Sequence, residues 1–137
     1  MTTASELDDL FSSNADAEEN GVWIDVTQTI KMKIRAYSAK AVSDLREQLT
    51  KPFQTMLRAG VKIPDEQDKE IGRKVIAGAV IADWKGISDA EGIEVPYSSS
   101  EALATLTRLP KMLNFVIGIS TDAQFYKDAL QEDGAKN

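Results

Sequence analysis

Cysteine and histidine are both absent from the 137 residues of this chain. Without cysteine there is no thiol nucleophile, no disulfide and no thiolate zinc site. Without histidine there is no Ser-His relay and no imidazole acid–base group. Carboxylate chemistry remains open, because Asp and Glu can act in pairs or around a magnesium ion. Together the two absences favour a protein that is not an enzyme and that needs no cofactor.

Long hydrophobic runs are also missing. No stretch approaches the ~18 apolar residues that a bilayer span requires, and the opening MTTASELDDLFSS lacks the basic patch and apolar run of a secretory signal. The composition, 42% hydrophobic and 28% charged, is ordinary for one globular domain. We expect a protein of the cytoplasm that makes no contact with a membrane.

Positive charge is missing from one end of the chain. Residues 1–20 hold six of the 22 acidic residues and none of the 16 basic ones, so residues 21–137 are formally neutral and the net charge of −6 belongs to the first 20 residues. Nucleic-acid binding needs an excess of Lys and Arg on one face. An acidic segment on a neutral body therefore argues against a nucleic-acid partner.

The acidic segment is expected to be a tail, disordered or weakly helical, because it has too little apolar area to offset its ordering entropy. The globular domain would then be residues 21–137. Leu7, Leu10 and Phe11 follow helical spacing and could form an amphipathic turn against a partner. The alternative is a solvated tail whose few apolar residues bind nothing.

Two strands are expected after Gly21, because GVWIDVTQTIKMKIRAYS alternates at period two and is rich in β-branched residues. They would join around Thr27–Thr29, without the Asn-Gly pair typical of tight hairpins. The basic stripe on the second strand is either a solvated face or a docking surface for acidic groups; it consists of Lys31, Lys33 and Arg35.

Helices are expected along most of the remaining chain. The first begins with Ser38 as N-cap, is interrupted by Pro52 and ends at Gly60. The second runs from Pro64 to about Trp84 and is rich in Gly and Ala. It is either a buried central helix or a contact between subunits.

Two helices with an apolar segment between them are expected after residue 97. Ser98 with Glu101 predicts a capping box, and Thr121 with Gln124 predicts the start of a last helix over residues 122–133. Between them LPKMLNFVIGI, residues 109–119, is apolar nearly all round and should be buried. The pattern as a whole predicts an α+β fold, mostly helical with a small N-terminal antiparallel hairpin.

Acidic side chains near residue 90 invite two chemical interpretations. Asp89, Glu91 and Glu94 surround a glycine, but their spacing does not match a calcium-binding EF-hand loop, so an acidic turn is favoured over a metal site. Asp83 and Asp89 flank an aromatic residue, as the carboxylates of a small glycosidase do. Two ordinary loop acids are the commoner explanation.

The segment ADWKGISDAEGIEVPYS, residues 82–98, resembles tail assembly chaperones of long-tailed bacteriophages. The hairpin, the basic strand IKMKIRAYS, the helix RKVIAGAVIADW and the late helix beginning STDAQF resemble the same family in the same order, over roughly residues 21–133. The residues that carry the resemblance fit structural roles as readily as functional ones; they are Trp84, Gly86, Gly92, Pro96 and Tyr97.

The resemblance implies a mixed fold and a protein that binds the tape measure protein in the host cytoplasm and is absent from the virion. It also implies that a longer, frameshifted product engages the tail-tube subunit, with this chain, ending at EDGAKN, as the short form. The alternative is a structural tail or head-tail joining protein that stays in the virion.

We expect a homo-oligomer, and candidate partner-binding residues in two places. The first is the acidic segment with its three apolar residues. The second is the apolar run near the C-terminus; it contributes Leu109, Met112, Leu113 and Val116.

Overall fold

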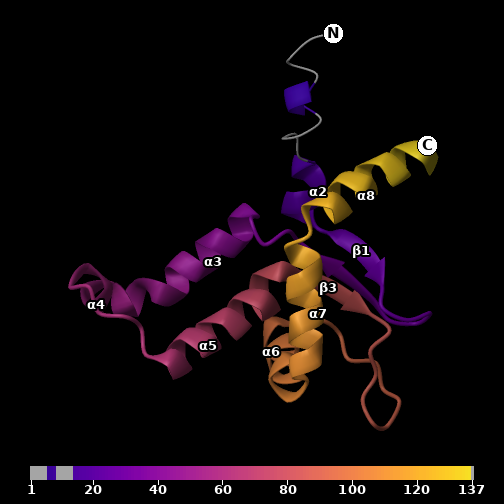
Figure 1. Cartoon of the computed structure of the whole chain (residues 1–137). Helices are drawn as coiled ribbons and strands as arrows, with labels where there is room; N and C mark the ends of the chain where they lie inside the picture. The colour runs from indigo at the N-terminus through magenta and orange to yellow at the C-terminus, as the bar shows by residue number, and fades with distance from the viewer. Residues whose placement is uncertain (1–5, 9–13, 137) are drawn as a thin grey trace.

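The computed structural model describes the backbone of residues 6–8 and 14–136, and the side chains of these residues up to Ala129. It is mostly helical around a three-stranded antiparallel sheet of order β1-β2-β3 (Figure 1), which confirms the predicted α+β fold. In chain order the elements are α2 (Ala15–Asn20), β1 (Val22–Asp25), β2 (Lys31–Ile34), α3 (Lys40–Thr50), α4 (Gln54–Arg58), α5 (Asp65–Val75), β3 (Ile81–Lys85), α6 (Ser99–Arg108), α7 (Pro110–Ser120) and α8 (Ala123–Lys136).

The predicted hairpin is confirmed as β1 and β2, which pair antiparallel. Thr27 organises the turn, because its Oγ1 accepts hydrogen bonds from the backbone N–H groups of Thr29 and Ile30. A side chain that accepts these hydrogen bonds stabilises the turn, as an Asn-Gly pair does in tight hairpins. On β2, Met32 and Ile34 are buried and the lysines that alternate with them are only half-buried, as the period-two pattern predicts.

The third strand corrects two predictions, a helix running to Trp84 and a sheet confined to the N-terminal hairpin. A π-helical turn, Ile76–Val80, follows α5, and the chain then extends as β3 along the free edge of β2. Ala82 is the extra residue of a β-bulge, so Ile81 and Trp84 both reach the core although they are three positions apart. Helical periodicity could not reveal this, because the pairing partner lies far away in the sequence.

α3 begins at Lys40, and the prediction of Ser38 as its N-cap is wrong. Ala39 occupies the cap position and has no side chain that could accept a hydrogen bond. The acceptor comes from another element, since the Glu19 carboxylate of α2 accepts a 2.9 Å hydrogen bond from the Lys40 N–H. A carboxylate at this end of a helix also suits the helix dipole.

The predicted interruption at Pro52 is confirmed. The chain forms a 3-10 turn over Lys51–Phe53, restarts as α4, and turns back at Gly60, whose φ is 78°. Helices α3 and α4 therefore form an arm that reaches away from the sheet, and α5 returns along it (Figure 1). Leu57 and Val61, near the tip of this arm, are 46% and 50% exposed.

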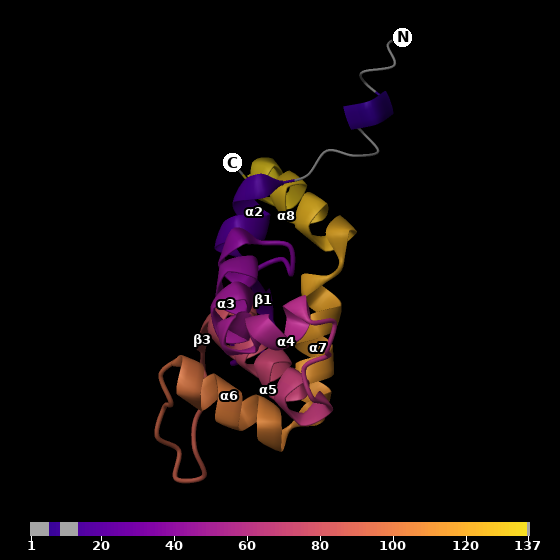
Figure 2. The same cartoon turned by 90° about the vertical axis from the view of Figure 1, so that its left-hand side faces the viewer.

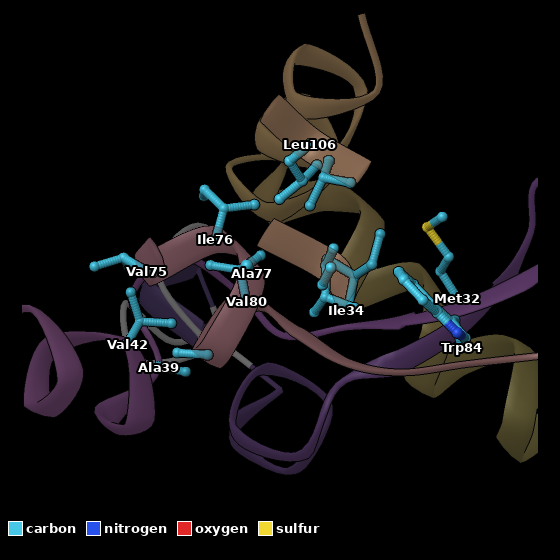
Figure 3. Packing of buried hydrophobic residues seen from close by; sticks show 14 of the residues in the cluster. Met32, Ile34, Ala39, Val42, Val75, Ile76, Ala77, Val80, Trp84 and Leu106 are labelled. Atoms are coloured by element: carbon cyan, nitrogen blue, oxygen red, sulfur yellow. The ribbon is translucent and has the colours of Figure 1, made fainter. Parts of the chain in front are cut away.

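The small-residue segment that follows α5 is buried in the centre of the molecule, as one of the two interpretations predicts. Apart from Gly78, residues 75–80 are at most 2% exposed, and they pack against α3, the sheet and α6 (Figure 3). A Cβ at Gly78 would lie 3.1 Å from Leu45 Cδ2, so α3 approaches closely because that side chain is absent. Most of this segment is therefore packed within the chain, and Gly78 alone stays partly accessible.

The caps of the two later helices are formed by side chains. Ser98 Oγ accepts a 3.1 Å hydrogen bond from the Glu101 N–H, which confirms the predicted cap of α6. At α8 the acceptor is Asp122, whose Oδ1 bonds the Phe125 N–H at 3.2 Å. The prediction of Thr121 as this cap is wrong, because its hydroxyl instead bonds a carbonyl of the last turn of α7.

Part of the acidic segment is helical, one of the two states predicted for it, and residues 14–20 pack against the body of the protein. Helix α2 lies beside α8 (Figure 2). The Asn14 side chain donates to the Tyr126 carbonyl at 3.2 Å, and the Glu18 carbonyl accepts from the Ala36 N–H at 3.0 Å. Ala17 is buried between these partners. Composition alone could not show these long-range contacts.

Tyr126 joins α8 to the sheet. From its burial we predict that the protein loses stability at alkaline pH. Its ring is 1% exposed and its hydroxyl donates to the Ile34 carbonyl at 3.1 Å. Burial, with a smaller effect of Glu18 and Asp122, raises the pKa of this phenol above its ordinary value of about 10. The folded protein then keeps a proton that the unfolded chain releases, so stability is complete below about pH 10 and falls as the pH rises further.

Tyr126→Phe tests this linkage. The variant should lose about 1 kcal/mol near pH 7, because one buried hydrogen bond is removed, and should lose less additional stability than the wild type between about pH 9 and pH 11. Urea unfolding at several pH values measures both. An identical alkaline slope in the two proteins would contradict the assignment to Tyr126.

Candidate partner-binding surface

The first predicted partner segment is only partly described by the structure. Leu7 lies in a short helical stretch, residues 6–8, and is 50% exposed. Leu10 and Phe11 lie outside the described residues. An exposed Leu7 is available to a partner, and the amphipathic arrangement of the three residues stays a prediction.

The second predicted set lies on α7 and divides into a buried and an accessible part. Val116 is completely buried in the core, so it offers no surface to a partner. Met112 and Leu113 are half-buried against the same core, and Leu109 is 42% exposed. Phe115, which the sequence analysis did not single out, is also 42% exposed. Residues 109–119, which were expected to be buried, are therefore only partly buried within the single chain.

A groove lies between α5 and α7. Its volume is about 430 Å³. Most of its wall is apolar and comes from the two helices and the turn after α5, and one residue before α3 and one after α7 also line it. We call it the α5–α7 groove; it is lined by Tyr37, Lys69, Gly72, Arg73, Ile76, Leu113, Ile117 and Thr121.

Cations stand at the rim of this apolar groove. Lys69 and Arg73 lie four positions apart on α5 and so share one face of that helix. Arg73 Nη2 is 3.0 Å from Glu70 Oε2, and this pair remains partly exposed. At the end of the groove the Arg46 guanidinium donates to the Tyr37 hydroxyl and lies 5.5 Å from the ring centroid. The rim is therefore positive around an apolar floor.

Sequence reasoning did not identify this groove. The signal was present in the spacing of Lys69, Gly72, Arg73 and Ile76, which places all four on one side of α5 and the turn that follows it. What the spacing could not show is that α7 stands opposite that side. The wall that comes from α7 is the part of the apolar run that was expected to be buried.

A second apolar groove lies on another side of α5, among α3, α5 and α6. Its volume is about 360 Å³, and Leu45, Leu49 and Leu103 contribute to its walls. Its other lining residues are Lys74, Ala77, Gly78 and two serines at the start of α6. Apolar recesses therefore flank the central helix on two sides.

The residues that carry the phage resemblance have structural roles here. Trp84 Nε1 donates to the Val95 carbonyl at 2.8 Å, and the Trp84 and Tyr97 rings meet edge to face at 5.6 Å. The Tyr97 hydroxyl lies 2.7 Å and 2.9 Å from the carbonyls of Ala77 and Ile81. Burial raises the Tyr97 pKa, and a hydrogen bond with the side chain of the next-but-one serine partly opposes this. These hydrogen bonds and the ring contact hold the loop after β3 against the π-helical turn and the start of β3.

The glycines of the same motif serve turns. Gly86 and Gly92 both have φ near 81°, in the region that favours glycine. Gly86 also sits against the backbone of Thr29 in the hairpin turn, whereas the surroundings of Gly92 are open. Pro96 is exposed just before Tyr97. None of these three residues forms a binding surface by itself.

The acidic side chains considered as chemical candidates hold local backbone in place. Asp83 Oδ1 accepts from the Trp84 N–H at 2.8 Å. Asp89 Oδ1 accepts from the N–H groups of Glu91 and Ile93 at 2.9 Å and 3.0 Å, which makes it the closing residue of a turn. Among the described residues no cluster of three or more acidic side chains is placed to hold a metal ion. Nor does any helix in the described part of the chain have the length and hydrophobicity to cross a membrane.

Comparison with known proteins places the chain in one family. Residues 37–137 match the family model described as YdaY prophage protein. This region starts after the β1–β2 hairpin and includes α3 to α8. It therefore contains the helices that line the two grooves and the whole loop after β3. Neither the curated proteins nor the solved structures gave a match. Because the match spans well over half of the chain, the chain belongs to the YdaY prophage protein family and is a phage-derived protein.

Proposed function

We propose that this protein is a non-catalytic tail assembly chaperone that binds the tape measure protein and helps to recruit tail-tube subunits. Membership of a prophage protein family supports a role in phage biology. The resemblance of residues 21–133 to tail assembly chaperones supports the specific role.

The observation that carries the proposal is the apolar α5–α7 groove. Leu109, just before α7, and Phe115, on another face of α7, add exposed apolar surface outside the groove. A tape measure protein is a long helical client, and an amphipathic helix binds by laying its apolar face against apolar surface. Exposed apolar surface that is larger than single scattered residues marks interaction sites on soluble proteins. A chaperone of this kind needs such surface and needs no catalytic side chain.

The proposal has three further parts. The protein works in the host cytoplasm and is absent from the mature virion. It forms homo-oligomers, so that several copies cover one elongated client. A longer frameshifted product carries the contact with the tail-tube protein.

Co-purification with the tape measure protein encoded by the same prophage tests the function. The tagged chain should keep this client soluble as a complex, whereas the client expressed alone should be insoluble. Leu109→Asp with Phe115→Asp should weaken the complex by about tenfold or more, because both changes place charge on apolar contact surface. Val26→Asp, at a site 38% exposed on the hairpin, is the matched control and should have no effect.

Two results would contradict the proposal. One is failure of the wild-type chain to bind the client. The other is the detection of this chain in purified virions by mass spectrometry, which would favour a structural tail or head-tail joining protein. Light scattering over micromolar to near-millimolar concentrations tests oligomerisation separately, and a strict monomer would remove that part.

A further inference from the structure

We infer that the α5–α7 groove binds an amphipathic helix whose apolar face is flanked by Asp or Glu. This inference rests on the proposed function and specifies the chemistry of the client segment. It commits to this groove among those beside α5, and to one sign of charge on the partner.

The floor of the groove fits the apolar face of a helix. Ile76 is 2% exposed, and Leu113 and Ile117 of α7, which line the same groove, are half-buried. Gly72 has no side chain, and no heavy atom lies within 4 Å of where its Cβ would stand. A side chain of an incoming helix can therefore approach the backbone of α5 at this position.

Both walls of the groove are helical, and this decides the kind of partner. The backbone N–H groups in the interior of α5 and α7 are used within those helices, so the groove presents no strand edge to an extended peptide. A helix instead supplies side chains at positions i, i+3, i+4 and i+7 and needs no backbone partner from the groove. Helix packing against α5 and α7 is therefore the mode that this surface allows.

The rim decides the charge of the partner. Lys69 and Arg73 contribute two cations to the groove lining, and no acidic residue is among the described residues that line it. Glu70 compensates Arg73 in part, but both side chains stay accessible, with exposed fractions of 41% and 26%. Arg46 adds a third cation at the Tyr37 end. Carboxylates beside the apolar face of the partner would meet these cations, and lysines there would be repelled.

Two synthetic peptides of about five helical turns test the inference on the full-length protein. They share leucines at the i, i+3, i+4 and i+7 positions and differ only in flanking glutamate or flanking lysine. Fluorescence anisotropy of labelled peptide should show the glutamate peptide binding at least about tenfold more tightly. Its affinity should fall as salt is raised, because part of the attraction is between partly exposed charges.

Gly72→Leu should abolish binding of the glutamate peptide, because it fills the groove. The variant should fold, since leucine favours a helix over glycine and the added side chain meets open space. Gly118→Leu is the matched control: Gly118 is exposed in α7, its Cβ position is equally open, and it does not line the groove. Circular dichroism checks that both variants remain helical.

A charge-reversal series tests the rim. Lys69→Glu with Arg73→Glu should reverse the preference, so that the lysine peptide becomes the tighter binder. Lys85→Glu reverses an exposed lysine on β3, outside the groove lining, and should leave the preference unchanged.

Several outcomes would overturn the inference. They are equal binding of the two peptides, full binding by Gly72→Leu, and an oligomer that Gly72→Leu dissociates, which would make a second copy the occupant. Deletion of residues 1–12 that raises peptide affinity by about tenfold or more would make the chain's own acidic segment the occupant. Failure of the proposed function is distinguishable, because it is the absence of any complex between the wild-type chain and the tape measure protein. A complex that forms but is indifferent to Gly72→Leu would overturn the groove assignment alone.

Discussion

Gly86→Ala is expected to destabilise the fold by about 2–5 kcal/mol. About 1–2 kcal/mol comes from forcing a side chain into the φ of 81° that this residue has. A further ~1–3 kcal/mol comes from overpacking, because the new Cβ would overlap the Thr29 carbonyl oxygen and lie 2.8 Å from its carbon. The obstacle is backbone of the β1–β2 turn, which cannot rotate away as a flexible side chain could.

Gly92→Ala is the matched control for this prediction. Gly92 has the same φ of 81°, but nothing lies within 4 Å of its Cβ position. It should therefore cost only the conformational part, about 1–2 kcal/mol. Urea unfolding of the two variants measures the difference. Equal losses would show that the close approach between Gly86 and the hairpin turn does not exist.

Trp84→Ala is expected to cost about 3–5 kcal/mol, the range typical of removing a large aromatic side chain from a core. Trp84 is 4% exposed, packs edge to face on Tyr97 and donates a hydrogen bond to the Val95 carbonyl. The change leaves a cavity and an unpaired carbonyl, and it releases the loop after β3. Unfolding followed by far-UV circular dichroism measures the loss without depending on tryptophan fluorescence.

Trp23→Ala tests whether the stability loss expected for Trp84→Ala comes from burial of the side chain rather than from the loss of a tryptophan as such. Trp23 is 37% exposed on β1, and its ring is 4.4 Å from Lys85 Nζ. An exposed cation–π contact of this kind is worth about 0.5–1 kcal/mol, so this variant should lose far less stability than Trp84→Ala. Similar losses at both positions would contradict the assignment of Trp84 to the core.

The strands and helices that follow from local pattern were predictable. The period-two alternation over residues 22–35 specifies the hairpin, because it places one apolar face on one side of the sheet. Pro52, Gly60 and Ser98 mark breaks and starts through the backbone chemistry of single residues. These effects act within a few positions of each residue, so a sequence alone contains them.

Three features that the local pattern did not reveal depend on distant partners. Residues 81–85 become a strand because β2 offers a free edge. α3 is capped by a carboxylate of α2, and residues 14–20 join the body because α8 accepts them. In each case the local composition favours another state and a tertiary contact overrides it.

The candidate site shows the same division. The cations and the glycine of α5 lie on one side of their helix through spacing alone, and so the sequence contained half of the groove. The other half comes from α7, and only the crossing of the two helices places Leu113 and Ile117 opposite Ile76. The packing of α7 also decided that Val116 is core while Leu109 and Phe115 are exposed, a distinction invisible in a run that is apolar on every side.

The sequence by itself determined the α+β class, the hairpin, the position of most helices and the absence of thiol and imidazole chemistry, since each follows from residue types and short-range periodicity. Only the tertiary structure decided the third strand, the place of the acidic helix and the groove between α5 and α7. The physical reason is that burial and hydrogen-bond partners are properties of pairs of segments, and these segments meet only after the chain has folded.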